Sequence, residues 1–122
     1  MTKDSREGGK KDEKLASTHL KKNKYKILEK NFRTRQGEID IIAEDKEDVL
    51  CFVEVKARST EDYGLPAEAV TSHKQKRLLI AAFKYIESKK IQCRDMRFDI
   101  VSVDLNSGRA DILKNAFDVN YY

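Results

Sequence analysis

The sequence has little of what disulfide frameworks, cysteine metal sites and membrane spans require. It contains two cysteines, one proline and no tryptophan among 122 residues. Its longest apolar runs, Val49–Val53 and Leu78–Phe83, are far shorter than the roughly 20 residues that cross a bilayer. Because Cys51 and Cys93 both lie in apolar patterns, we expect reduced, buried thiols in a cytoplasmic protein that contacts no membrane.

Size and charge favour one small domain with a basic end. The N-terminus has no apolar segment typical of a secretory signal, and residues 1–11 are expected to form a flexible basic tail before a single domain, 12–122. Residues 1–35 hold twelve Lys and Arg against five Asp and Glu, whereas the remainder holds thirteen against sixteen. Such a basic end points to a polyanionic partner such as nucleic acid, but charge alone is better explained by a solvated tail that keeps the protein soluble.

The clearest local pattern is a β-hairpin. Residues 37–44 and 49–57 are rich in β-branched residues, and the polar turn 45–48 separates them. A helix is predicted before this hairpin, beginning at Asp12, and a strand over 25–32. After it, apolar residues at three- and four-residue spacing predict a long helix over 67–89.

The C-terminal third predicts two more strands. Residues 97–105 alternate strictly, residues 110–113 follow a turn, and Phe117 is expected to pack against the domain. The resulting order, α-β-β-β-α-β-β, predicts an α/β (α+β) protein with helices covering a mixed sheet.

Charged residues interrupt the apolar hairpin at three positions. Residues two apart in a strand point to the same face, so Glu54 and Lys56 are expected to project together, with Val53 and Val55 on the opposite face. Asp40, on the neighbouring strand, could reach the same place. Charged groups in mid-strand are unfavourable unless they pair or bind something. On these residues alone, an ion pair between Glu54 and Lys56 on a solvated face remains an alternative.

Two carboxylates and a lysine suit metal-assisted phosphodiester hydrolysis. Mg²⁺ prefers oxygen ligands, commonly one or two carboxylates together with water and substrate phosphate. Asp40 and Glu54 can supply the carboxylates and the main-chain carbonyl of Val55 a third oxygen. Lys56 can then orient or help deprotonate the attacking water. The expected cofactor is Mg²⁺ or Mn²⁺.

Five ordered blocks resemble the YraN-like family of bacterial proteins. They are GEIDIIA (37–43), FVEVKAR (52–58), YGLPAEAV (63–70) with Lys74 after it, RFDIVSV (97–103) and NAF (115–117). The resemblance runs from about Gly9 to Phe117. It implies a place in the PD-(D/E)xK nuclease superfamily, with similarity to Holliday-junction resolvases and a restriction-endonuclease-like core.

The resemblance also implies roles for particular residues. Asp40, Glu54 and Lys56 match the superfamily's catalytic positions, and Glu13 matches a first-helix glutamate that often approaches the metal through water. A glutamate that simply favours the helix dipole is the alternative for Glu13. Where the family usually has glycine before that glutamate, this chain has Asp12.

Several basic residues are expected to contact nucleic acid. Lys74 and Arg77 open the long helix, and Arg58 follows the strand that carries Glu54. Arg33 and Arg35 belong to a basic rim, for which solubility is the alternative explanation. Phosphate contacts of this kind position a backbone without reading its sequence.

The sequence thus predicts a metal-dependent endonuclease that acts on structured or branched DNA. Two other functions remain open: a non-catalytic nucleic-acid-binding or adaptor module that keeps the fold, and RNA processing by the same site. By analogy with proteins that act on two-fold-like junctions, a homodimer is expected.

Overall fold

The computed structural model describes residues 2–58, 70–92 and 94–117. The predicted order α-β-β-β-α-β-β and the α+β class are confirmed. The elements are α1 (Thr2–Lys22), β1 (Lys26–Arg33), β2 (Glu38–Glu44), β3 (Leu50–Arg58), α2 (Ser72–Ser88), β4 (Met96–Asp104) and β5 (Ala110–Leu113).

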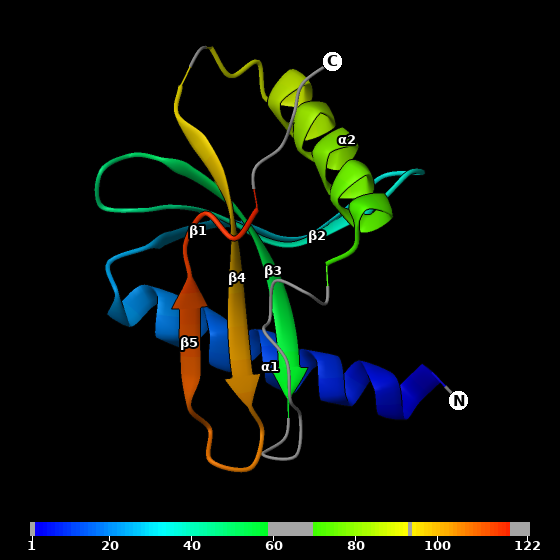
Figure 1. The fold of residues 1–122 in the computed structure, drawn as a ribbon, viewed down its shortest axis with the longest axis vertical. Helices are drawn as coiled ribbons and strands as arrows, with labels where there is room; N and C mark the ends of the chain where they lie inside the picture. The colour runs from blue at the N-terminus through cyan, green and yellow to red at the C-terminus, as the bar shows by residue number, and fades with distance from the viewer. Residues whose placement is uncertain (1, 59–69, 93, 118–122) are drawn as a thin grey trace.

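The strands form one sheet in the order β1-β2-β3-β4-β5 (Figure 1). The first three make an antiparallel meander, β4 is parallel to β3, and β5 is antiparallel to β4. Parallel neighbours need a long crossover between them, and the connection from β3 to β4 contains α2. The crossover therefore returns α2 to the sheet beside the hairpin of β2 and β3.

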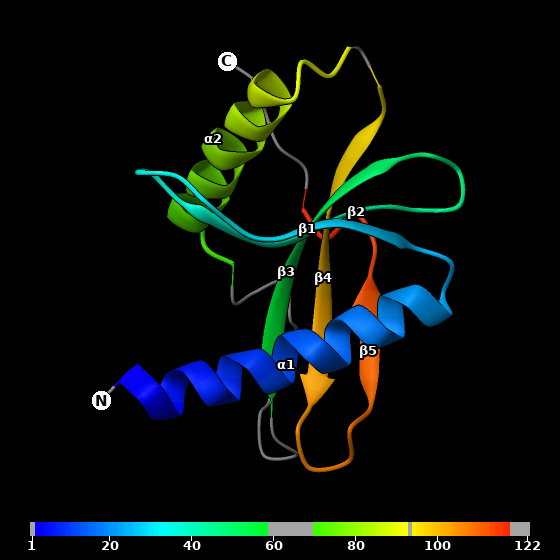
Figure 2. The same cartoon turned by 180° about the vertical axis from the view of Figure 1, so that it is seen from behind.

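The two helices bury opposite faces of the sheet. Ala16 and Leu20 of α1 pack with a cluster that includes Ile41, Val53 and Val101. A second cluster joins α2 to the other face. Its members include Leu78, Ala82, Ile42, Phe52 and Phe98. Figure 2 shows α1 crossing in front of β3, β4 and β5, while Figure 1 shows it behind them. The alternation of β3 thus separates an α1 face from an α2 face.

Both helices begin elsewhere than predicted. Helix α1 begins at Thr2, so the predicted start at Asp12 was wrong: Lys, Arg and Glu, which favour helices, outnumber the glycine pair before it. Helix α2 begins at Ser72 because Thr71, in an extended conformation, caps it by accepting the Lys74 N–H. Of the predicted helix 67–89, residues 67–69 lie outside the described residues.

Other predictions about the chain fare differently. Cys51 is a free, buried thiol as expected, whereas Cys93 lies outside the described residues. Phe117 stacks on Phe98 with ring centroids 5.1 Å apart. Within the described residues, no helix is long and apolar enough to span a membrane. The division into a tail of 1–11 and a domain of 12–122 stays a prediction.

A buried polar network on the α1 face joins the start of β4 to the hairpin turn. Arg97 donates to Asp99 at 2.9 Å, to Asp45 at 2.9 Å and to the Tyr25 hydroxyl at 3.0 Å. Asp99 is fully buried and also accepts the Asn115 N–H. Burial lowers the pKa of Arg97, but the hydrogen bond and charge of Asp99 outweigh burial and raise it overall. The guanidinium therefore stays charged and compensates two buried carboxylates.

Removing this guanidinium should destabilise the fold strongly. Arg97→Met leaves Asp99 buried without its cation, and we expect a loss of about 3–5 kcal/mol in the free energy of unfolding. Tyr25→Phe removes only one hydroxyl of the network and should cost about 1 kcal/mol. Urea unfolding followed by circular dichroism measures both. Equal losses for the two variants would show that the network does not depend on its charge.

Candidate functional site

The site lies where β2 and β3 separate. Their ladder ends at the pair Ile41 and Val53, and the next residues along the two strands are Asp40 and Glu54. Beyond this point the Val55 N–H donates to Asp40 Oδ2 at 2.8 Å. The Asp40 carboxylate therefore takes a backbone donor of β3 and is held beside Glu54.

An irregularity in β2 produces this separation. Residues two apart in a regular strand share a face, yet Ile39 packs in the α2-side cluster and Ile41 in the α1-side cluster. Across β1, the register places Asn31, with a left-handed φ of 54°, opposite Asp40. Strands β1 and β2 are thus both distorted at the level of Asp40. This distortion permits the Asp40 side chain to turn toward β3.

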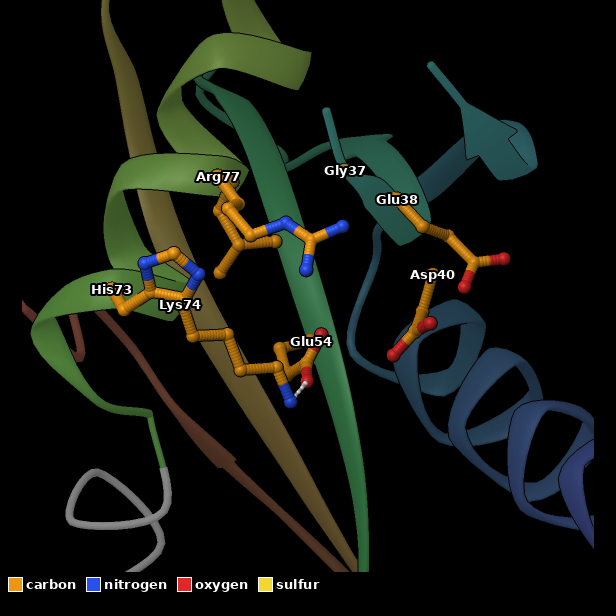
Figure 3. Close-up of a pocket in the computed structure, with 8 residues that line it drawn as sticks. Gly37, Glu38, Asp40, Glu54, His73, Lys74 and Arg77 are labelled. Carbon is orange, nitrogen blue, oxygen red and sulfur yellow. Dashed lines mark ion pairs between the residues drawn. The ribbon is translucent and has the colours of Figure 1, made fainter. Parts of the chain in front are cut away.

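A pocket fills the space between these strands and the first turns of α2. Its described lining combines acidic residues of the sheet with basic residues of the helix (Figure 3). It consists of Gly37, Glu38, Asp40, Glu54, His73, Lys74, Arg77 and Leu78. One wall is therefore negative and the facing wall positive.

The two carboxylates differ in how their charge is compensated. Glu54 is 7% exposed, and its Oε2 lies 2.5 Å from Lys74 Nζ. Burial first, and then the charge of Glu54, raise the pKa of Asp40 to about 7, although the Val55 N–H acts in the opposite direction. In Figure 3, Lys74 reaches from α2 to Glu54 while Asp40 points toward Glu54 from the other side. The positive charge beside the pair is not enough to keep Asp40 fully ionised at neutral pH.

The other predicted catalytic and metal-binding residues surround this pair. Lys56 is half-buried, two residues beyond Glu54 on β3 and so on the same face, but it is not among the described lining residues. Val55 packs toward the α1 side, and metal binding by its carbonyl stays a prediction. Glu13 accepts a hydrogen bond from Asn31 at 2.9 Å, which places it one strand away from Asp40.

The residues predicted to bind nucleic acid separate into two groups. Lys74 and Arg77 line the pocket, with Lys74 engaged by Glu54. The remaining three lie outside it: Arg33 pairs with Glu38, Arg58 pairs with Asp111, and Arg35 is exposed beside a shallow cavity next to α2. Contact of any of the five with nucleic acid stays a prediction.

Sequence reasoning missed several lining residues. Glu38 precedes Asp40 by two positions, and His73 directly precedes Lys74, so proximity to the predicted residues was the available signal. Gly37 was not recognised: a Cβ there would lie 2.7 Å from the Arg77 carbonyl oxygen, so α2 packs directly on its backbone. This contact joins two segments that are distant in sequence.

Comparisons with known proteins agree with the resemblance. Residues 12–103 match the model of "Uncharacterised protein family UPF0102", which is the YraN family. The chain belongs to the UPF0102 family. The UPF0102 protein of Syntrophus aciditrophicus is 43% identical, over 93% of this chain and 90% of that protein. The UPF0102 protein of Chloroherpeton thalassium is 46% identical, over 90% of this chain and 81% of that protein.

The pKa of Asp40 predicts that the contribution of this residue to the stability of the fold decreases as pH rises. Its pKa is about 7 in the folded state and about 4 in the unfolded chain, so between these values the folded state binds more protons. Asp40→Asn keeps an acceptor for Val55 but carries no charge. It should therefore match the wild type near pH 4 and be more stable at pH 8, by on the order of 1–3 kcal/mol.

Urea unfolding at both pH values, with EDTA present, measures this difference. Glu87→Gln, an exposed carboxylate on α2, is the control and should show no pH-dependent gain. If the difference in stability between Asp40→Asn and the wild type does not change with pH, the pKa of Asp40 is not raised in the folded state.

The close approach at Gly37 predicts a steric requirement in the pocket wall. Gly37→Ala forces its Cβ against the Arg77 backbone and should cost about 1–3 kcal/mol by displacing α2. Gly108→Ala meets nothing within 4 Å, but φ is +76° there. We expect it to cost about 1 kcal/mol from backbone conformation alone. Only Gly37→Ala should also change the near-ultraviolet circular dichroism of the rings that pack together at α2, Phe32, Phe52 and Tyr85. An unchanged near-ultraviolet spectrum would contradict the steric requirement.

Proposed function

We propose that this protein is a metal-dependent endonuclease that hydrolyses phosphodiester bonds in structured or branched DNA. One observation carries the proposal: β2 and β3 separate so that Asp40 and Glu54 face each other beneath basic residues of α2. Carboxylates suit a divalent cation, and the facing cations suit a phosphate. The resemblance to PD-(D/E)xK nucleases supports the same chemistry.

The residues present fit Mg²⁺ or Mn²⁺. Both carboxylates line the same pocket, where burial first, and then the charge of Glu54, raise the pKa of Asp40. A divalent cation bound between them would offset both effects. The described residues contain no group of three or more His, Cys, Asp or Glu placed to share one ion. Two carboxylates agree with Mg²⁺, which commonly keeps several waters. The Val55 carbonyl would add an oxygen, and Glu13 would act through water.

The chain's own residues supply the rest of the proposed chemistry. When bound, the metal would neutralise developing phosphate charge and activate water. Lys56, on the same face as Glu54, would orient the attacking water and hold a proton at Nζ. Lys74 and Arg77 would hold the phosphate at the opposite wall of the pocket. The first turn of α2, which carries His73 and Lys74, lines the same pocket and would add the partial positive charge of a helix N-terminus.

Nucleic-acid recognition would rest on phosphate contacts outside the pocket. Arg33, Arg35 and Arg58 are all exposed, so they can reach a backbone at little desolvation cost. DNA is favoured over RNA by the similarity to junction resolvases, and a homodimer would match a two-fold junction. In bacteria such as those that carry the relatives, this substrate lies in the cytoplasm.

One observation favours a second candidate, a non-catalytic nucleic-acid-binding or adaptor module. Lys74 already compensates the charge of Glu54, so a metal ion would have to compete with this ammonium for the carboxylate. In such a module the ion pair would be permanent and the carboxylates would bind no metal. Metal titration separates the two functions.

Removing either carboxylate should abolish cleavage without abolishing DNA binding. Asp40→Asn and Glu54→Gln each remove one anionic metal ligand, and we expect the rate on a four-way DNA junction to fall at least about 100-fold. Junction affinity measured in EDTA should change only a few-fold, since the phosphate contacts of the basic residues remain. Gel assays with Mg²⁺ and with Mn²⁺ measure cleavage.

Glu87→Gln is the matched control and should cleave as the wild type does. Flaps, single strands and RNA, assayed in parallel, identify the substrate class. Cleavage by both carboxylate variants at the wild-type rate would exclude this site. Absence of both cleavage and Mn²⁺ binding in the wild type would favour the adaptor module.

A further inference from the structure

We propose that Lys74 is an exchangeable counter-ion: it holds Glu54 in the metal-free protein, leaves when a divalent cation binds, and then contacts substrate phosphate. This inference rests on the proposed function and adds a coupling between metal and DNA. Three features of the described residues support it: the ion pair itself, the way Lys74 is held, and the charge of the pocket.

The ion pair is unequal in burial. The Glu54 side chain is 8% exposed, whereas the Lys74 side chain is 39% exposed. A carboxylate this buried needs a compensating cation, and Lys74 is its only ion-pair partner among the described residues. The lysine, by contrast, is partly exposed, so water can hydrate its ammonium when it leaves Glu54. Glu54 therefore depends on a cation more than Lys74 depends on Glu54.

The backbone of Lys74 is fixed by the helix cap, whereas its amine is joined to that backbone by a flexible side chain. Its backbone N–H donates at 3.2 Å to Oγ1 of Thr71, and Thr71 is the N-cap of α2. The ammonium stands at the end of a flexible four-carbon chain, so it can leave Glu54 without disturbing the helix. Exchange thus requires only side-chain rotation.

A divalent cation and the ammonium compete for the same carboxylate. A metal held by Asp40 and Glu54 would place two positive charges beside Lys74 Nζ, and like charges at such separations repel strongly. The released ammonium remains on the wall that also carries His73 and Arg77 (Figure 3). There it adds positive charge where a phosphate would lie. The metal would therefore increase DNA affinity both directly and through Lys74, and by linkage DNA would favour metal binding.

Calorimetric titration with Mn²⁺ tests the competition directly. Lys74→Met removes the competing cation, and we expect it to bind Mn²⁺ about 3–10-fold more tightly than the wild type. Lys76→Met is the matched control: it removes the same charge from α2, two residues on, at a side chain outside the carboxylate pocket. It should bind Mn²⁺ as the wild type does.

Fluorescence anisotropy with a synthetic four-way DNA junction tests the second half. In Ca²⁺, Lys74→Met should bind more weakly than the wild type, and its salt dependence should lose about one phosphate contact. In EDTA, where Lys74 is held by Glu54, the two should bind alike. The affinity of Lys76→Met relative to the wild type should be the same in Ca²⁺ and in EDTA.

Thermal unfolding in EDTA checks whether the Lys74 variant is folded and whether its loss of stability comes from the uncompensated charge of Glu54. Lys74→Met should unfold at a lower temperature than the wild type, and Glu54→Gln combined with it should recover most of the loss. If Lys74→Met does not fold, Lys74→Gln replaces it, because glutamine can still donate to Glu54 without a charge.

The outcomes separate the two proposals. Tighter Mn²⁺ binding together with a Ca²⁺-dependent loss of DNA affinity supports the exchange. Equal or weaker Mn²⁺ binding by a folded Lys74 variant overturns it, while Mn²⁺ binding by the wild type leaves the proposed nuclease intact. Absence of Mn²⁺ binding in the wild type and both variants overturns the proposed function itself, and the exchange with it.

Discussion

The hydrogen bond from the Val55 N–H to the Asp40 carboxylate is the interaction on which the site depends. In a continuous ladder, that amide would donate to a β2 carbonyl, and no pocket would open between the strands. Here a side chain satisfies the donor, so β2 can turn away without leaving a buried N–H unpaired. The same bond fixes the Asp40 carboxylate beside Glu54. Separation of the strands and placement of the acids are therefore linked through this one hydrogen bond.

Holding two carboxylates together is unfavourable, and the rest of the fold offsets it. Helix α2 supplies Lys74 to Glu54 but nothing comparable to Asp40, whose pKa is raised to about 7. On the α1 face, by contrast, Arg97 forms ion pairs with both Asp45 and Asp99. Two separate hydrophobic clusters, one on each face of the sheet, stabilise the frame. The charges of Asp40 and Glu54 lie in the pocket, opposite the wall that carries Lys74 and Arg77.

The order of elements was predictable because it follows local patterns. Alternation of β-branched residues in 37–57 predicts the hairpin of β2 and β3, and the interrupting acids identify Asp40 and Glu54 as neighbours. Helix ends were less predictable. The start of α1 at Thr2 ran against a glycine pair, and the cap at Thr71 lay within a helix predicted from periodicity alone. The Arg97 network was not foreseen, because its partners Asp45 and Tyr25 are distant in sequence.

The sequence by itself determined the order of strands and helices. It also determined the family to which the chain belongs, because both depend on the order and spacing of residues. It also placed Asp40, Glu54 and Lys56 on one hairpin. Only the tertiary structure decided which cation compensates Glu54. A lysine two residues along the same strand was the local alternative, but the crossover brings Lys74 of α2 to the carboxylate instead. Packing of Gly37 against the Arg77 backbone sets that approach, and such contacts depend on how distant segments fold together.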